Sequence, residues 1–219
     1  MQRMGGEDRQ CPEAGGRKLQ GRKGYKGGGP WPRHPPVGMA LLLLSLGLSL
    51  VSTQELNPQA IVRKNYDMAK VSGVWYSVSM ASDDMKRIEK DGDLRVFIQN
   101  IESLEDGSLK FNFQFMVLGE CVKVAVVCEK TDRNGEYTVN YEGDNRVLLS
   151  ETDYKLYITF HLRNMRNGTE TNVLALYGRV PDLSPSFLER FEKVCRKYGL
   201  GPQNILSLSD QNDCCKYKK

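Results

Sequence analysis

Few residues of this chain carry side chains that could act as metal ligands or nucleophiles. His161 is the only histidine after residue 53, and the sequence contains no Cys-x-x-Cys pair and no paired histidines. A protein metal site needs several such ligands at matched spacing. We therefore expect no metal, no cofactor and no catalytic residues. Cysteines and tyrosines remain as the groups with chemical potential.

Five cysteines follow residue 53, namely Cys121, Cys128, Cys195, Cys214 and Cys215. An odd number leaves at least one free thiol or an intermolecular link. Cys195 lies among apolar residues at helical spacing and is expected to be a buried small hydrophobe. Cys128 shares strand parity with Val126 and is a remote candidate nucleophile, so an enzyme acting on a lipid is a less favoured alternative.

The positive charge of the chain is concentrated at its N-terminus. Residues 1–38 carry eight Lys or Arg and three Asp or Glu, a net charge of +5, whereas the remaining residues carry a net charge of −1. Affinity for nucleic acid needs a basic face on the folded domain itself. We therefore expect no nucleic-acid partner.

The first 53 residues have the composition of a leader. Residues 1–38 are rich in Gly, Pro and Arg and are expected to be disordered, because they can bury little apolar surface. Residues 39–53 hold an apolar run shorter than the ~20 residues of a membrane-spanning helix. This run fits a signal peptide cut before Gln54, with Met39 as the biological start, and a buried strand or helix is the alternative. Residues 54–219 would then form a secreted, extracellular domain without stable membrane insertion.

From residue 54 onward, short apolar strands alternate with turn dipeptides. Asp-Gly, Asn-Gly or Glu-Gly pairs stand at 91–92, 106–107, 134–135, 142–143 and 167–168, and such pairs favour tight hairpins. Between them, apolar residues recur at every second position over 94–98, 109–115, 122–126, 137–141, 156–162 and 173–177. This pattern predicts an all-β sandwich or barrel.

One helix is predicted near the C-terminus. Ser184 can cap it, Pro185 suits its first position and Gly199 can end it. The apolar residues between them recur at steps of three and four and form one stripe that would lie against a sheet, namely Phe187, Leu188, Phe191, Val194, Cys195 and Tyr198.

Three separated motifs make residues 54–219 resemble the lipocalin family. The motifs are Gly73-x-Trp75, the triplet Thr152-Asp153-Tyr154, and Arg179 after a late strand. The details are similar to the major urinary and epididymal branch. The resemblance implies an eight-stranded antiparallel up-and-down β-barrel, a calyx, with one C-terminal α-helix packed on it. In such a barrel Trp75 would plug the closed end, and Arg179 would stack on its indole by cation–π attraction.

The resemblance also implies which side chains line the calyx. The expected ligand-binding positions are Leu94, Val96, Ile98, Leu109, Phe111, Phe113, Val126, Val139, Tyr141, Val147, Phe160, Leu162, Val173, Ala175 and Tyr177. None of them is charged, so the lining should favour neutral, apolar ligands. Tyr177 matches the branch's polar contact and is expected to orient the ligand. The segment 80–88 would be a loop over the open end, with Met85 or Ile88 pointing inward.

The resemblance implies two covalent features as well. It pairs Cys121 with Cys214, although Cys215 departs from the family pattern and leaves the choice of tail partner open. Asn167 begins an Asn-Gly-Thr sequon at an expected hairpin tip, which predicts N-glycosylation; a plain Asn-Gly turn is the alternative.

These observations favour a secreted carrier of a small hydrophobic molecule, such as a retinoid, steroid, fatty acid or odorant. The resemblance suggests the epididymis as its site of action. The expected partners are the small molecule and a cell-surface receptor, with the protein a monomer or a weak dimer. The alternative is a secreted interaction protein whose barrel is filled by its own side chains.

Overall fold

The computed structural model describes residues 54–117 and 120–209, and nearly half of these residues lie in strands. The strands are β1 (Gly73–Val74), β2 (Tyr76–Ser82), β3 (Phe97–Ser103), β4 (Leu109–Val117), β5 (Glu120–Lys130), β6 (Glu136–Asn140), β7 (Asp144–Thr152), β8 (Tyr157–Arg166), β9 (Thr169–Gly178) and β10 (Ile205–Ser207). The helix is α2 (Pro185–Lys197), and short 3₁₀ turns lie at η1 (Pro58–Ala60), η2 (Met68–Val71), η3 (Met85–Arg87) and η4 (Pro202–Asn204). The predicted leader, 1–38, and the predicted signal peptide, 39–53, lie outside the described residues.

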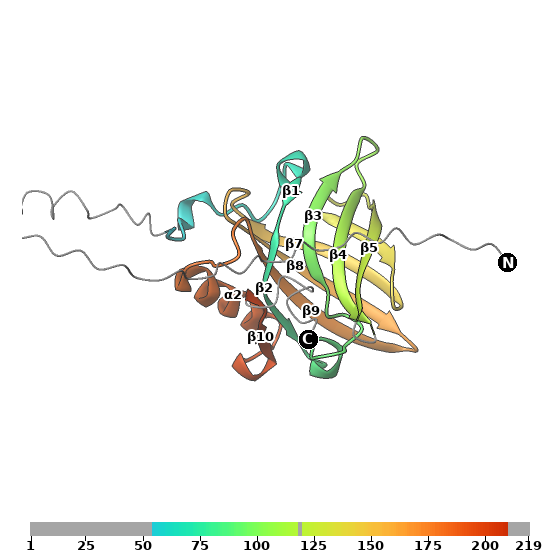
Figure 1. Ribbon diagram of the computed structural model, residues 1–219. Helices are drawn as coiled ribbons and strands as arrows, with labels where there is room; N and C mark the ends of the chain where they lie inside the picture. Colours follow the sequence, from blue (N-terminus) through green and yellow to red (C-terminus); the bar gives the residue numbers. More distant parts are fainter. Residues whose placement is uncertain (1–53, 118–119, 210–219) are drawn as a thin grey trace, which may run out of the picture. The chain divides into compact units, whose positions relative to one another are not determined.

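The strands form one antiparallel sheet in the order β1-β3-β4-β5-β6-β7-β8-β9-β2-β10. Strands β1 and β2 are two halves of one strand, separated by Trp75. The first half, β1, pairs with β3 at one edge of the sheet, and the second half, β2, pairs with β9 near the other edge. The sheet therefore closes on itself, as the curled strands of Figure 1 show. The predicted all-β barrel with one helix is confirmed, with a difference in count. The described residues form ten strands rather than eight, since the first strand is interrupted at Trp75 and β10 is added on β2.

Two strand boundaries differ from the sequence prediction. Strand β3 begins at Phe97 rather than at Leu94, where the predicted alternating segment 94–98 starts, because the residues before Phe97 fold into a turn in which Leu94 N donates to Arg87 O (2.9 Å). Asp91 occupies a left-handed conformation (φ 67°) in this turn. Met80 to Ser82, predicted as the start of the covering loop, instead belong to β2.

Buried apolar residues form two cores. One fills the barrel interior and includes Trp75, Ile98, Leu109 and Phe160. The other lies between the outer face of β2, β8 and β9 and the helix, where Val78 and Leu176 meet Phe191. Successive side chains of a strand point to opposite faces, so one strand supplies apolar residues to both cores.

Helix α2 buries one side against the barrel, where it lies next to β2 and β10 in Figure 1. Phe187, Phe191, Val194 and Cys195 are buried as predicted. The predicted stripe was too wide, however, because Leu188 remains 38% exposed.

The ends of α2 follow the sequence signals in part. Pro185 opens the helix and Gly199 has a positive φ of 76° just after it. The Ser184 side chain makes no capping hydrogen bond and instead lies 2.8 Å from Ser186 Oγ. At the other end, Tyr198 is 40% exposed and its ring packs on His161, with 4.2 Å between the ring centroids.

A buried ion pair ties the helix to the sheet. Arg190 of α2 donates from Nε to Glu151 Oε1 of β7 at 2.7 Å, and Tyr157 donates its hydroxyl to the same oxygen at 3.0 Å. Burial alone would raise the pKa of Glu151, but the hydrogen bonds from Arg190 and Tyr157 outweigh it and hold the pKa below its usual value. The carboxylate therefore stays ionised beneath the helix at neutral pH.

Candidate functional site: the barrel interior

The closed end of the barrel is built around Trp75. Its side chain is fully buried, and the indole nitrogen donates to Val71 O at 2.7 Å. The Arg179 guanidinium carbon lies 3.7 Å from the indole centroid. The same guanidinium donates to the carbonyl oxygens of Val74 (3.0 Å) and Ser72 (3.0 Å). These contacts seal the end of the barrel where the first strand is interrupted.

The Thr152-Asp153-Tyr154 motif forms the turn between β7 and β8. Thr152 Oγ1 donates to Tyr157 O at 2.6 Å, and Asp153 Oδ1 accepts from the backbone N–H groups of residues 155, 156 and 157. Tyr154 takes a left-handed conformation (φ 61°), and its carbonyl accepts from Arg179 Nε at 3.3 Å. The three motifs therefore meet at one end of the barrel, around Trp75, and have a structural role.

A cavity of about 90 Å³ lies inside the barrel. Its lining is almost wholly apolar and contains no Asp, Glu, Lys, Arg or His. The residues are Met80, Leu94, Val96, Phe111, Phe113, Val126, Cys128, Val139, Tyr141, Asn145, Val147, Phe160, Leu162, Val173, Ala175 and Tyr177. Every predicted lining residue is among them except Ile98 and Leu109, which are fully buried in the interior core.

Three residues of the lining were not predicted as ligand-binding positions. Met80 reaches the cavity because the register of β2 shifts between Ser77 and Ser79, which reverses the faces of the strand after that point. Asn145 shares the inward parity of Val147, so alternation alone could have indicated it. Its amide nitrogen is satisfied by three backbone carbonyls of its own hairpin at 2.7–3.1 Å. Cys128 shares the inward parity of Val126, so alternation along β5 indicates its place in the lining as well.

The two tyrosines of the lining differ in hydrogen bonding. Tyr141 donates its hydroxyl to Asp93 O at 3.3 Å. Tyr177 is 5% exposed, and among the described residues its hydroxyl has no hydrogen-bond partner. Burial raises the pKa of Tyr177 well above its usual value, so the phenol stays protonated and able to donate. Tyr177 therefore presents a hydroxyl to the cavity that the barrel itself does not use.

Aromatic rings occupy much of the interior. Phe111 stacks on Phe113 with 5.6 Å between ring centroids and meets the edge of Phe160 at 5.4 Å. The ring of Phe160 lies 6.1 Å from that of Tyr177. This aromatic cluster, Phe111, Phe113, Phe160 and Tyr177, is the main reason that the cavity is small.

Among the described residues, Cys121, Cys128 and Cys195 form no disulfide with one another. Burial raises the pKa of Cys128 to about 12, and it raises that of Cys195 to about 12 as well. A thiol with so high a pKa is a poor nucleophile at neutral pH. Cys121 is half-buried on β5, and its predicted partner Cys214, like Cys215, lies outside the described residues.

The remaining predicted positions lie on the outer surface of the barrel. His161 is absent from the cavity lining, is buried, packs against the ring of Tyr198, and its Nε2 lies 2.9 Å from Asn172 Oδ1. Asn167 is exposed between β8 and β9 with φ 51°, in the hairpin tip that the sequence predicted. Within residues 54–117 and 120–209, no cluster of His, Cys, Asp and Glu could hold a metal ion, and no helix has the length and apolar character to cross a membrane.

A family comparison decides what kind of barrel this is. The model of the lipocalin / cytosolic fatty-acid binding protein family matches residues 72–212. The chain is a lipocalin. Human epididymal-specific lipocalin-9 is 58% identical to it over 176 residues, which cover 80% of this chain and 92% of the relative. Mouse major urinary protein 4 is 39% identical over 180 residues, covering 81% of this chain and 99% of the relative. The predicted family and branch are confirmed.

One solved structure that the chain resembles contains a bound ligand. The crystal structure of trichosurin, a lipocalin of possum milk whey, matches with a TM-score of 0.61 and 33% identity over 64% of this chain and 98% of that chain. That structure contains bound 4-ethylphenol. A single aromatic ring with one hydroxyl is therefore a ligand of a related barrel.

Proposed function

We propose that this lipocalin is an extracellular carrier of a small, neutral, apolar molecule that bears one hydrogen-bonding group. The observation that carries the proposal is the uncharged cavity with the unpartnered Tyr177 hydroxyl at its wall. An ionised ligand would lose its hydration without gaining a counter-charge, so the lining disfavours it. A neutral ligand with a hydroxyl or carbonyl group gains one hydrogen bond with the Tyr177 hydroxyl and gives up much less hydration free energy than an ion does.

The size of the cavity narrows the ligand class. In another protein, a cavity of about 150 Å³ lined by Leu, Ile and Phe accommodates benzene. The cavity here, at about 90 Å³, is smaller still. The ligand is therefore a single-ring or short-chain volatile molecule. Rotation of the Phe113 side chain, which lines the cavity and is only half-buried, provides the additional space that such a ligand needs. Retinoids and steroids would require the whole aromatic cluster to move.

Calorimetric titration with two matched probes tests the proposal. 4-Ethylphenol and 4-ethyltoluene have nearly the same shape, but only the phenol forms hydrogen bonds. We expect the protein to prefer the phenol by about tenfold, the effect of one hydrogen bond of about 1.4 kcal/mol. In Tyr177→Phe this preference should disappear, while 4-ethyltoluene binds as before. Ala175→Leu, which fills the cavity, should weaken both probes.

A filled barrel is the second candidate, and the small volume is the observation that favours it. If neither probe binds, and Phe113→Ala does not create binding either, the barrel is full and the protein acts through its surface, for instance on a receptor. Catalysis is the least favoured function, because Cys128 is the only nucleophile in the cavity lining and burial suppresses its thiolate. We propose a binding protein and not an enzyme.

The proposal extends to the route and processing of the chain. A signal peptide at 39–53, with a secreted domain from residue 54, would deliver the protein to the extracellular space. There, a disulfide between Cys121 and Cys214 and a glycan on Asn167 are chemically feasible. The exposed position of Asn167 supports modification at that site. Intact mass before and after glycosidase and reductant treatment tests both features.

A further inference from the structure

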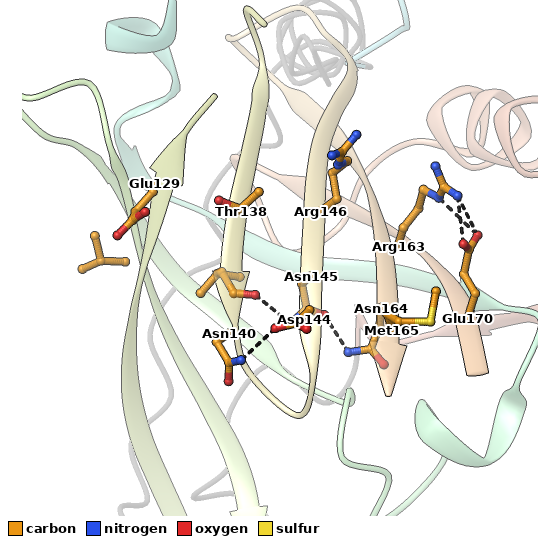
Figure 2. A pocket seen from close by; sticks show the side chains of 12 residues that line it. Glu129, Thr138, Asn140, Asp144, Asn145, Arg146, Arg163, Asn164, Met165 and Glu170 are labelled. Atoms are coloured by element: carbon orange, nitrogen blue, oxygen red, sulfur yellow. Dashed lines mark hydrogen bonds and ion pairs between the residues drawn. The ribbon is translucent and has the colours of Figure 1, made fainter. Parts of the chain in front are cut away.

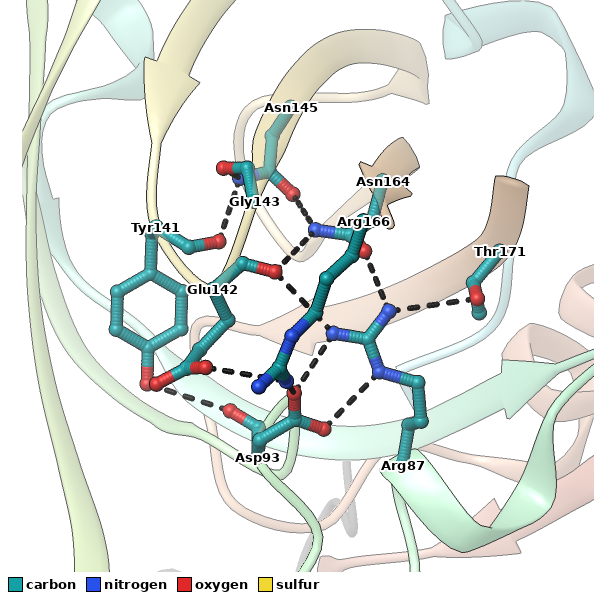
Figure 3. Close-up of polar contacts among 9 residues, drawn as sticks. All are labelled: Arg87, Asp93, Tyr141, Glu142, Gly143, Asn145, Asn164, Arg166 and Thr171. Atoms are coloured by element: carbon teal, nitrogen blue, oxygen red, sulfur yellow. Dashed lines mark hydrogen bonds and ion pairs between the residues drawn. The ribbon is translucent and has the colours of Figure 1, made fainter. Parts of the chain in front are cut away.

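The open end of the barrel is covered by the segment between β2 and β3, and this segment is locked in place (Figure 3). Arg87 donates to both carboxylate oxygens of Asp93, at 3.0 and 2.7 Å. Arg166, from the far end of β8, donates to the same carboxylate at 2.7 Å and pairs with Glu142 at 3.2 Å. We call this group, Arg87, Asp93, Glu142 and Arg166, the latch.

Further bonds fix the latch to the rim. Arg87 also donates to Asn164 Oδ1 and to Thr171 Oγ1 (3.3 Å), and Tyr141 donates to Asp93 O (3.3 Å). Beneath the latch, Ile88 is fully buried in the interior core. The hydrogen bonds from Arg87 hold the pKa of Asp93 below its usual value, so these ion pairs persist at neutral pH. Opening the barrel at this end would break several charge-assisted bonds together.

The wall between β5 and β6 is much less tightly held. These strands pair only at Glu129↔Thr138 and Lys130↔Tyr137, whereas β4 and β5 pair continuously from Leu109↔Cys128 to Val117↔Glu120. Beyond the two pairs, β5 and β6 separate, and Figure 2 shows the space between them. No ladder hydrogen bond closes the wall there.

A groove of about 660 Å³ lies on the outside of this gap. Val127 on β5 borders the groove and is 48% exposed, while its neighbours Val126 and Cys128 border the inner cavity. Val139 and Asn145 border both the groove and the cavity. The barrier between outside and inside is therefore a single layer of side chains.

We propose that the ligand enters and leaves through this gap between β5 and β6, with Val139 as the gate, and not through the latched end. The inference rests on the proposed carrier function. The physical reason is the difference between the two barriers. Passage through the gap displaces apolar side chains where β5 and β6 are not paired, whereas passage through the latched end breaks an ion-pair network. Asn145 donates to the backbone carbonyl oxygens of Val139, Tyr141 and Gly143 and so holds the backbone of the β6–β7 hairpin, which leaves the Val139 side chain as the part of the gate that moves.

Exchange rates of 4-fluorophenol, measured by ¹⁹F NMR on the purified protein, test the proposal. Val127→Trp places a bulky side chain over the outer face of the gap without entering the cavity. We expect both the association and the dissociation rate to fall by about fivefold or more, with the dissociation constant unchanged within about twofold. Lys123→Trp is the matched control, since Lys123 is an exposed residue on the same outward face of β5 that does not border the groove. Its rates should equal those of the wild type.

Asp93→Asn supplies the opposite test, because it weakens the latch and leaves the gap intact. Unchanged exchange in Asp93→Asn together with slow exchange in Val127→Trp would support the gap. Faster exchange in Asp93→Asn with normal exchange in Val127→Trp would overturn it and assign the route to the latched end. Normal affinity with either rate pattern leaves the carrier function intact. Absence of 4-fluorophenol binding in every variant would overturn both proposals.

Discussion

Arg179→Leu is expected to destabilise the barrel by about 3 kcal/mol, because one guanidinium joins several elements at the closed end. It stacks on Trp75 at 3.7 Å and donates to four carbonyl oxygens, those of Val74, Lys70, Ser72 and Tyr154, at 3.0–3.3 Å. Leucine keeps an apolar cover on the indole but removes the charge and every donor. The cation–π contact contributes about 1 kcal/mol. The half-exposed hydrogen bonds contribute at the low end of their usual range.

Urea unfolding followed by far-ultraviolet circular dichroism measures this loss. With a denaturant slope of about 2 kcal/mol per molar, the midpoint should fall by about 1.5 M. Arg179→Lys should lie between the two proteins, because an ammonium keeps the charge but lacks the planar fork. Arg163→Leu is the matched control, since Arg163 lies on the surface and pairs only with Glu170; its midpoint should stay unchanged. A midpoint shift below about 0.5 M for Arg179→Leu would refute this reasoning, because it would leave under about 1 kcal/mol for all five contacts.

Three further changes test other parts of the fold. Glu151 has a folded-state pKa below its usual 4.5, so the stability that its ionised carboxylate contributes is complete above pH 4.5 and is lost as the pH falls through the folded-state pKa. Glu151→Gln should remove this acid sensitivity in urea titrations at several pH values. At pH 7 it should lower the free energy of unfolding by about 3 kcal/mol. Thr159 is buried, and its hydroxyl is fully shut off from solvent and has no hydrogen-bond partner among the described residues, so Thr159→Val should raise the free energy of unfolding by about 1 kcal/mol in the same assay. Gly135 has φ 80°, and an added Cβ would lie 2.5 Å from a ring carbon of Tyr66, so Gly135→Ala should lower the thermal midpoint by several degrees, and a midpoint equal to that of the wild type would contradict this steric account.

The interior of the barrel was largely predictable because alternation is a local property of a strand. Once one inward residue of a strand is known, its neighbours at every second position follow, as for Phe160 and Leu162 on β8. The prediction loses accuracy where the register shifts. Val78 packs beneath the helix while Met80 enters the cavity, although both occupy even positions of one strand. A bulge depends on the partner strand, so the sequence of β2 alone does not reveal it.

Contacts between distant segments were not predictable. Arg87, Asp93 and Arg166 are ordinary surface residue types in the sequence, and only closure of the barrel brings β8 to the segment before β3. The weak pairing between β5 and β6 is equally a property of two strands together, since each has a good strand sequence by itself. The volume of the cavity depends on how four aromatic rings share the interior, which the identities of the rings do not determine.

The interruption of the first strand at Trp75 has a consequence for folding kinetics. Tyr76 of β2 pairs with Gly178 of β9, so a strand that is synthesised early waits for one that is synthesised late. Closing so long a loop costs entropy before any contact compensates for it, and non-local pairing of this kind makes folding slow. Until β9 emerges, the apolar edge of β2 has no partner and is open to wrong pairing. Yield in the cell should therefore depend on how well this edge is protected during synthesis.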